Sequence, residues 1–222
     1  MSLISASNLH RGFTIGKKRI EVLRGIDLTI EAGEKVFLCG PSGAGKTTLM
    51  YTLAGLERPE QGEVMVEGTN LYAIGKNKQA RLRNDSMSYI FQNFNLMPEL
   101  TAIENVMIPA LIGGKHAQDA AKAVLERVGL GHRLDHLPAE LSGGEQQRVS
   151  IARSLINKPR VIFADEPTGN LDSKNGQQVM QLLIELATED NTALVVVTHD
   201  TSLATLGDRT YTVNDGTIAE GL

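Results

Sequence analysis

The stretch Gly40-Pro41-Ser42-Gly43-Ala44-Gly45-Lys46-Thr47-Thr48 decides how the rest of this 222-residue chain is interpreted. It follows an apolar run at 35–39, which predicts a buried strand, and it leads into a helical pattern at 48–55. In that context G-x-x-x-x-G-K-[ST] indicates a phosphate-binding loop. Glycines let backbone N–H groups turn toward phosphate oxygens, and the helix N-terminus adds a partial positive charge. The stretch therefore predicts a nucleoside-triphosphate site.

The same stretch predicts two side-chain roles. Lys46 would neutralise the β- and γ-phosphates, and the hydroxyl of Thr47 would ligate Mg²⁺. A glycine-rich turn that merely precedes a helix is the alternative, but both flanks of the loop favour the nucleotide site. We therefore expect all of residues 40–48 to contribute to nucleotide binding.

The composition limits the class of protein. A chain of this length suits one compact domain, or a domain with a sizeable insertion. The formal net charge of −4 argues against a nucleic-acid partner, which would select a basic face. The single cysteine, Cys39, cannot form an internal disulfide, which fits a reducing compartment, and its apolar surroundings predict a small core residue.

Neither a secretory signal nor a membrane span is expected. The N-terminal residues lack a basic region followed by a long apolar stretch, and the apolar run 193–197 is only long enough for a strand. Any membrane-spanning part of a complex would therefore belong to another polypeptide.

Hydrophobic periodicity predicts strands that alternate with helices, and hence an α/β fold with a parallel sheet. Expected strands lie at 3–9, 22–30, 63–67, 87–91, 160–164 and 193–197, with a solvated turn at 16–19 and a C-terminal hairpin that turns at 214–216. Expected helices lie at 48–55, 76–84, 101–111, 117–128, 145–157 and 174–188. We expect a single domain over 1–222, in which a core with an antiparallel layer comprises 1–90 and 143–222 and a helical subdomain comprises about 91–142.

Two adjacent acids follow the apolar run 161–164. The run predicts a strand through the core that leaves Asp165 at its carboxyl end, beside the phosphate loop, where it could hold Mg²⁺ opposite Thr47. Glu166 could polarise the attacking water as a general base. Solvated acids at a strand end are the alternative interpretation.

A further motif begins at Ser142. Ser142 followed by Glu145 predicts a capping box at the start of a helix. Capping does not require Gly143 and Gly144, and two glycines at a helix start open the backbone N–H groups to an anion. In isolation, a helix cap alone is the better interpretation.

The order of these features resembles the ATP-binding cassette of ABC transporters over essentially the whole chain. The series comprises the phosphate loop, Gln92, Leu-Ser-Gly-Gly-Glu-Gln-Gln at 141–147, Asp165-Glu166, Asn-Leu-Asp at 170–172 and Thr-His-Asp at 198–200. The Leu-Ser-Gly-Gly element separates cassettes from other proteins with a phosphate loop. The resemblance implies the P-loop NTPase fold of ABC ATPases, ATP hydrolysis, and ATP and Mg²⁺ as ligands.

The resemblance also implies roles that the residues alone leave open. Gln92 would sense the metal and contact a membrane subunit, and His199 would hydrogen-bond the γ-phosphate and orient Glu166. Phe13, otherwise readable as a half-buried strand aromatic, would stack on adenine; the family more often has Tyr there, and Phe keeps the stacking face. The predicted catalytic residues are thus Lys46, Gln92, Glu166 and His199, and the predicted metal ligands are Thr47, Gln92 and Asp165.

The family pattern implies a second copy of the chain as a partner. In such cassettes Ser142, Gly143 and Gly144 complete the site of a second cassette, so that two ATPs are held in a head-to-tail homodimer. Hydrolysis releases the dimer, which couples the chemistry to a membrane partner.

Finer likenesses point to a subgroup. The stretches 40–47, 92–115 and 165–172 are most similar to the bacterial subgroup of LolD, MacB and FtsE, and within it to the lipoprotein-releasing cassette. This likeness implies permease partners of the MacB or LolC/LolE type, which move periplasmic domains, and a location at the cytoplasmic face of the inner membrane. Macrolide or peptide export and a division complex are the alternatives within the subgroup, and a soluble, non-transport ABC ATPase is the alternative of another class. The apolar candidates for a groove that receives a coupling helix are Phe94, Leu96, Met97, Leu100 and Ile103, with core packing as the other interpretation.

Overall fold

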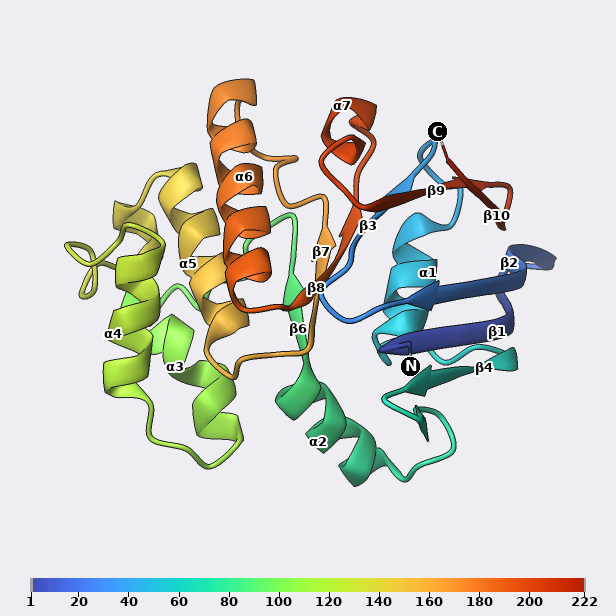
Figure 1. Cartoon of the computed structure of the whole chain (residues 1–222), viewed down its shortest axis with the longest axis horizontal. Coiled ribbons are helices and arrows are strands. Elements are labelled where there is room, and N and C mark those ends of the chain that lie inside the picture. The colour runs from blue at the N-terminus through green and yellow to red at the C-terminus, as the bar shows by residue number, and fades with distance from the viewer. Residues whose placement is uncertain (1, 222) are drawn as a thin grey trace. The chain divides into compact units, whose positions relative to one another are not determined.

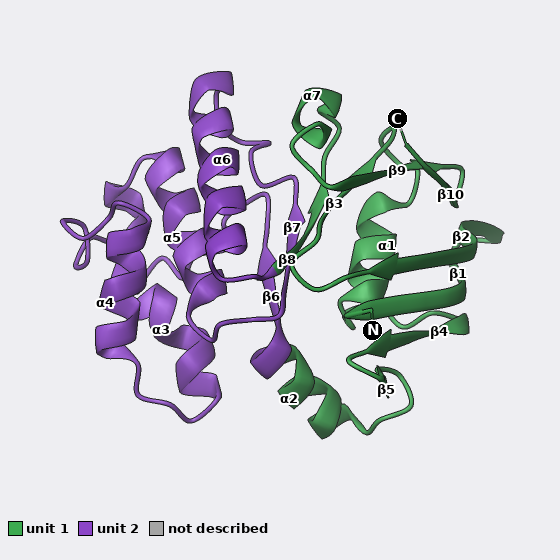
Figure 2. Ribbon diagram, in the orientation of Figure 1, with its two compact units in different colours: residues 1–83, 193–222 green, residues 84–192 purple. Residues whose placement is uncertain are grey.

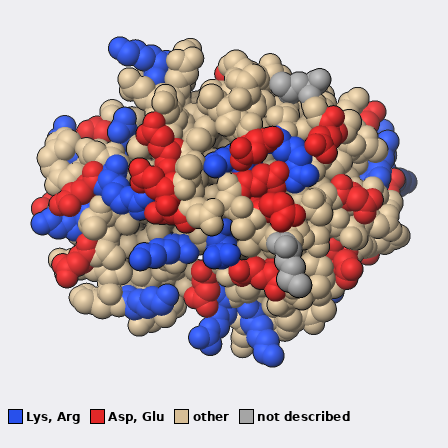
Figure 3. Space-filling model, viewed as in Figure 1, with Lys and Arg blue, Asp and Glu red and all other residues tan. Residues whose placement is uncertain are grey.

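The computed structural model describes residues 2–221 of the chain. They form two compact units, which Figure 2 distinguishes by colour. The first unit comprises residues 1–83 and 193–222, and the second comprises residues 84–192. Positive and negative side chains are interspersed over the face drawn in Figure 3, so neither sign of charge covers that face alone.

The first unit contains an antiparallel sheet with the strand order β2-β1-β4-β5. Its strands are β1 (Ile4–Ile15), β2 (Lys18–Ile30), β4 (Gln61–Val66) and β5 (Thr69–Asn70). This sheet confirms the expected antiparallel layer. The hairpin between β1 and β2 differs from the prediction, because both strands run on to Ile15 and Lys18 and leave only residues 16–17 in the turn.

The first unit also contains a parallel arrangement around β3 (Lys35–Cys39). The strand β3 pairs in parallel with β8 (Ala193–Val197) on one side and with β9 (Arg209–Asn214) on the other. The last strand, β10 (Thr217–Glu220), returns antiparallel to β9 through the expected hairpin. Residues Val36 to Cys39 are at most 1% exposed, as an apolar strand between two neighbours should be.

Three helices accompany these sheets. The helix α1 (Lys46–Leu53) lies beside β1 and β2 in Figure 1 and contacts β2 and β8. The charged helix α2 (Lys76–Ser86) runs across the sequence boundary of the two units, and none of its residues is fully buried. The short helix α7 (Thr201–Ala204), which the periodicity does not predict, follows β8.

The second unit combines a parallel strand pair with a group of helices, visible in Figure 1. The strands are β6 (Met87–Ile90) and β7 (Val161–Asp165), paired in parallel. The helices are α3 (Ala102–Ile112), α4 (Gln118–Arg127), a 3₁₀ turn at Pro138–Glu140, α5 (Gly143–Leu155) and α6 (Ser173–Glu189). The helix α5 packs against α3, α4, α6 and β6, so it is the central element of this unit.

Candidate nucleotide site

The phosphate loop lies in the first unit, between the buried strand β3 and the helix α1. Pro41, Ser42 and Gly43 are exposed, whereas Ala44 and Gly45 are buried at the base of the loop. Gly43 has a φ of 80°, and a Cβ atom built on it would meet nothing within 4 Å. The outer part of the loop therefore presents open backbone, as binding of phosphate oxygens requires.

Gly45 is the residue from which α1 begins. Its φ of 104° lies in the left-handed region, and a Cβ atom there would stand 2.8 Å from the carbonyl oxygen of Val22. Only glycine fits both conditions. As the N-cap residue it contributes no side-chain hydrogen bond, so the first N–H groups of α1 keep their capacity to bind an anion.

Lys46 is a buried cation held by neutral groups. It is 6% exposed, and its Nζ donates to the carbonyl oxygens of Gly40, at 2.8 Å, and Pro41, at 2.9 Å. An ammonium group has three donors and gains most from an anionic partner in a partly desolvated position. The position therefore suits a phosphate as the third partner of Lys46.

His199 lies at the same edge of the first unit's parallel strands as the phosphate loop. In the parallel pairing of β3 and β8, Leu38 lies opposite Val197, so the carboxyl ends of the two strands meet. The phosphate loop follows one strand, and exposed His199 follows the other. The next residue, Asp200, caps α7, and hydrogen bonds from Ser202 lower the pKa of its carboxyl group, with a smaller contribution from His199.

Cys39 ends the buried strand before the loop and is 1% exposed. Burial raises the pKa of its thiol, while the charge of Lys46 acts in the opposite direction. A raised thiol pKa disfavours the reactive thiolate. The prediction that Cys39 is a core residue is therefore confirmed.

Phe13 lies near the end of β1, paired with Ile20 of β2, and it is 36% exposed. The hairpin that carries it adjoins the phosphate loop, because the carbonyl group of Val22 in β2 faces Gly45. The chain thus places the proposed adenine platform and the phosphate loop in one unit.

The second unit brings Gln92 together with the loop that follows Asp165 and Glu166. The strands β6 and β7 pair with Ile90 opposite Ala164, so both segments begin at the carboxyl ends of neighbouring strands. A Cβ atom on Gly169 would lie 2.8 Å from the Nε2 atom of Gln92, which shows how closely the Gln92 side chain approaches this loop.

Glu166 and Asp165 are both half-buried at the end of β7. Glu166 has a φ of 45°, in the left-handed region that non-glycine residues seldom adopt and that recurs at functional sites. Asn170 fastens the same loop to the segment after β6, because its Nδ2 donates to the carbonyl oxygen of Gln92 at 3.0 Å and to Oδ1 of Asn93 at 2.9 Å.

Ser142 forms the predicted capping box in the second unit. Its Oγ accepts a bond from the Glu145 N–H group at 3.3 Å, and the Glu145 carboxylate accepts from the Ser142 N–H group at 2.9 Å. Bonds from Ser142, with help from Arg133, lower the pKa of the Glu145 carboxyl group. Gly144 stands in open space, with nothing within 4 Å of a built Cβ atom.

The predicted metal ligands lie in both units. Thr47 belongs to the first unit, and Gln92 and Asp165 belong to the second. A hydroxyl, an amide oxygen and a carboxylate are oxygen donors, the type that Mg²⁺ prefers, so the donor set fits this ion. Residues 2–221 contain no cluster of three or more His, Cys, Asp or Glu side chains that could hold a metal ion.

Some residues that support the site have no predicted role in the sequence analysis. Arg153 and Gln147, both on α5, bind main-chain carbonyl groups of the loops after β6 and β7, at 94–95 and 167 respectively. Arg11 covers the ring of Phe13. The amphipathic pattern of α5 could have drawn attention to Arg153 and Gln147 as polar residues within it, but the pattern does not indicate which groups they bind.

Comparison with known proteins decides the family. Residues 23–169 match the family model described as ABC transporter. This chain belongs to the ABC transporter family. As an ATP-binding cassette of this family it binds and hydrolyses ATP.

Curated relatives of this ABC cassette are similar over nearly its whole length. The lipoprotein-releasing system ATP-binding protein LolD of Shewanella frigidimarina is 48% identical over 97% of this chain and 91% of its own length. LolD of Hydrogenovibrio crunogenus is 48% identical over 96% of this chain and 94% of its own length.

Solved structures confirm the expected ABC ATPase fold. The dimeric ATP-binding cassette MJ0796 bound to ADP and Pi has a TM-score of 0.90 and 38% identity, covering 98% of this chain and 97% of that one. CbiO1 of Clostridium perfringens, part of the ABC transporter complex cbiONQ, has a TM-score of 0.87 and 26% identity, covering 99% and 88%. Among residues 2–221, the structure contains no helix with the length and apolar character of a membrane span.

Proposed function

We propose that this cassette is the ATP-hydrolysing subunit of a lipoprotein-releasing system, and that it drives membrane subunits which lift lipoproteins out of the inner membrane. The observation that carries the proposal is the 48% identity to LolD proteins over 97% of the chain. The cassette would lie on the cytoplasmic face of the inner membrane and act through permease subunits of the LolC/LolE type. Macrolide export and cell division are the alternatives within the same subgroup.

Each residue of the site has a proposed role in ATP binding or hydrolysis. The loop 40–48 holds the triphosphate, with Lys46 as the partner of the β- and γ-phosphates. Glu166 accepts the proton of the attacking water, and His199 hydrogen-bonds the γ-phosphate and orients Glu166. Phe13 stacks on adenine.

Mg²⁺, held by Thr47, Gln92 and Asp165, would supply charge neutralisation at the β- and γ-phosphates. The oxygen donors of these three residues support this ligand set. Gln92 would also report the state of the nucleotide to the membrane subunit, because its loop is fastened to Asn170 in the segment after β7.

The proposed active form is a head-to-tail homodimer with two ATP molecules between the copies. Ser142, Gly143 and Gly144 of one copy would face the γ-phosphate bound by the other. The open space around Gly144 and the capped start of α5 support this role, because they leave the helix N-terminus accessible. The structural relative MJ0796 forms a dimer, and it does so with ADP and Pi bound.

We also propose the functional division into a core at 1–90 and 143–222 and a helical subdomain at about 91–142. The membrane subunit would dock on apolar residues of the latter. Of these, Met97 is 51% exposed, and the others are half-buried: Phe94, Leu96, Leu100 and Ile103.

Reconstitution tests the proposed function. The cassette would be co-purified with its membrane subunits, placed in proteoliposomes that contain a labelled lipoprotein, and supplied with ATP and a soluble lipoprotein acceptor. We expect ATP-dependent transfer of the label to the acceptor, and none with Glu166→Gln. ATP hydrolysis without any transfer, in a complex that instead exports a macrolide, would assign the chain to another member of the subgroup.

A further inference from the structure

We infer that Arg11 is a positioning residue for the nucleobase: its guanidinium group holds one face of the Phe13 ring and leaves the other face for adenine. The inference rests on the proposed function, in which Phe13 is the adenine platform. Arg11 belongs to no motif of the chain, and its role would favour ligands that carry a base.

The central observation is the stacking of Arg11 on Phe13. The Cζ atom of Arg11 lies 4.6 Å from the centroid of the Phe13 ring. A guanidinium group at such a distance over an aromatic face is attracted by the ring quadrupole. The two residues are two positions apart on β1, at a place where the register with β2 shifts between Arg11 and Gly12.

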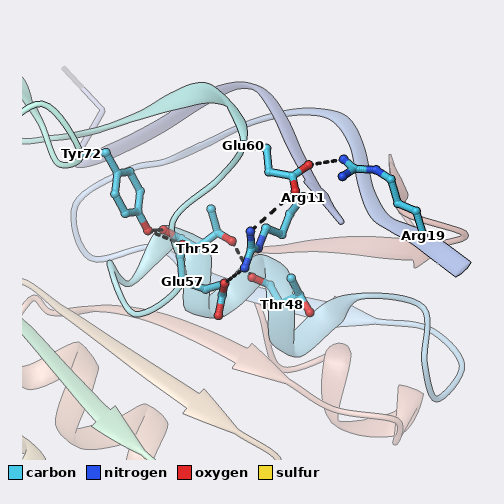
Figure 4. A network of polar contacts seen from close by, with 7 residues as sticks. All are labelled: Arg11, Arg19, Thr48, Thr52, Glu57, Glu60 and Tyr72. Carbon is cyan, nitrogen blue, oxygen red and sulfur yellow. Dashed lines mark hydrogen bonds and ion pairs between the residues drawn. The ribbon is translucent and has the colours of Figure 1, made fainter. Parts of the chain in front are cut away.

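Carboxylates of the segment after α1 fix the position of the guanidinium group. Figure 4 shows Arg11 bonded to Glu57 and directed toward Glu60, which lies 3.8 Å away. The Arg11 side chain is 23% exposed and the two glutamates are each 30% exposed, so the group is partly withdrawn from water. Its Nε is buried and finds no acceptor among the described residues, which leaves the ring face as a remaining favourable contact.

The partners of Arg11 are themselves held by main-chain bonds. The Tyr72 hydroxyl lies 2.6 Å from the carbonyl oxygens of both Thr52 and Glu57. Figure 4 marks these contacts with dashed lines. The Glu60 N–H group donates to the carbonyl oxygen of His10 at 2.8 Å. The segment after α1, the helix that begins at the phosphate loop, is thereby tied to β1 next to Arg11.

This arrangement has a consequence for the bound base. Phe13 is 36% exposed, so part of its surface remains open after Arg11 has covered the other part. An aromatic ring near a hairpin turn loses less freedom on binding when a second group already holds it, and such preorganisation increases affinity. Arg11 should therefore strengthen binding of ligands that carry a base, and only those.

Arg19 offers a matched control. It also pairs with Glu60, from the opposite side in Figure 4, but its side chain is 60% exposed and it packs across Gly12 rather than Phe13. Replacement of Arg19 removes the same charge and one partner of the same carboxylate. It leaves the contact between Arg11 and the ring in place.

The test measures dissociation constants of the full chain for ATP and for inorganic tripolyphosphate, each with Mg²⁺. Arg11→Ala should raise the constant for ATP by about 2- to 5-fold, the value of an exposed cation–π contact, and leave that for tripolyphosphate unchanged. Arg19→Ala should change neither, and Arg11→Lys should recover part of the ATP affinity. In a Phe13→Ala background, Arg11→Ala should have no further effect.

The outcomes separate the inference from the function on which it rests. Equal losses for ATP and tripolyphosphate, or additive losses in the double variant, would overturn the role of Arg11. If Phe13→Ala itself leaves ATP binding unchanged, the adenine platform is wrong. Thermal unfolding of each variant detects a folding defect. Arg11→Gln, a second replacement of similar length, distinguishes such a defect from the loss of the guanidinium group.

Discussion

Arg153, on α5, donates a hydrogen bond of 2.7 Å to the main-chain carbonyl oxygen of Phe94. A second bond from the same guanidinium group reaches the carbonyl oxygen of Asn95 at 2.6 Å. Phe94 and Asn95 have φ values of 60° and 48°, in the left-handed region, which is unfavourable for Phe and better tolerated by Asn. The helix that carries the Ser142 motif therefore holds the strained segment after Gln92 in place.

This relationship predicts the effect of Arg153→Ala. Burial lowers the pKa of the Arg153 guanidinium group, which nevertheless stays charged, and its loss would leave two carbonyl groups without their partner. We expect a loss of about 2–3 kcal/mol in the free energy of unfolding and faster amide hydrogen exchange at 92–97.

Arg148→Ala is the control for this measurement. Arg148 lies on the same helix and donates to the carbonyl oxygen of Val128 at 3.1 Å, away from the loop after Gln92. Arg148→Ala should change amide hydrogen exchange only near Val128. Unchanged exchange at 92–97 in Arg153→Ala would show that the loop keeps its conformation without the guanidinium group.

Asn105 predicts a stability effect of a different kind. It is fully buried, accepts from the Met97 N–H group at 2.7 Å, and donates to the carbonyl oxygens of Met97, Leu100 and Thr101 at 2.9–3.1 Å. Asn105→Ala should cost about 2–4 kcal/mol in urea unfolding, because buried main-chain groups lose their partner. Asn105→Asp should be no better, since a carboxylate cannot donate to these carbonyl groups; wild-type stability of this variant would contradict the assignment.

The capping box at Ser142 predicts a pH dependence. The pKa of Glu145 is lowered in the folded state, so its carboxylate stabilises the fold at neutral pH, and this contribution is lost as the pH falls through the folded-state pKa. Glu145→Gln should therefore be less stable than the parent at neutral pH and approach it under acid conditions. The measurement is the free energy of unfolding against pH, and parallel curves for the two proteins would refute the role of the charge.

The shared ATP site predicts the behaviour of two further variants. Glu166→Gln should bind ATP and accumulate as a dimer, because the attacking water loses its base while both halves of the site remain; light scattering with and without ATP measures this. Adding Gly144→Asp should restore the monomer, because it places a negative charge at the helix N-terminus that would face the γ-phosphate. Since Gly144 stands in open space, the Gly144→Asp replacement should change the thermal stability of the protein little. A Glu166→Gln protein that stays monomeric with ATP would contradict the shared site.

Lys46→Ala tests the phosphate loop alone. Removal of the buried ammonium group deletes the charge partner of the β- and γ-phosphates, and ATP turnover should fall to background. Retained turnover would mean that the nucleotide binds elsewhere. In the loop, Lys46 bonds only neutral carbonyl groups. Thermal unfolding of the Lys46→Ala protein checks separately that the variant is folded.

Much of the local structure could be predicted, because it depends on neighbours in the sequence. The bounds of β8 at 193–197 agree with the expected strand, since an uninterrupted apolar run has one stable environment. The capping box at Ser142 and Glu145 was likewise predictable from a spacing of three residues. The length of the hairpin β1–β2 could not be predicted, because the strands extend through its polar end only by pairing with each other.

By itself, the sequence determined the phosphate loop between strand and helix, the acids at the end of a buried strand, and through their order the ABC family. Each of these is a short-range pattern, whose meaning comes from the chemistry of adjacent residues. Only the tertiary structure decided that Arg11 lies against Phe13 and is held by Glu57, and that Arg153 fastens the segment after Gln92. These contacts join residues up to 59 positions apart, and no local periodicity specifies which distant carbonyl group or carboxylate a buried guanidinium group will meet.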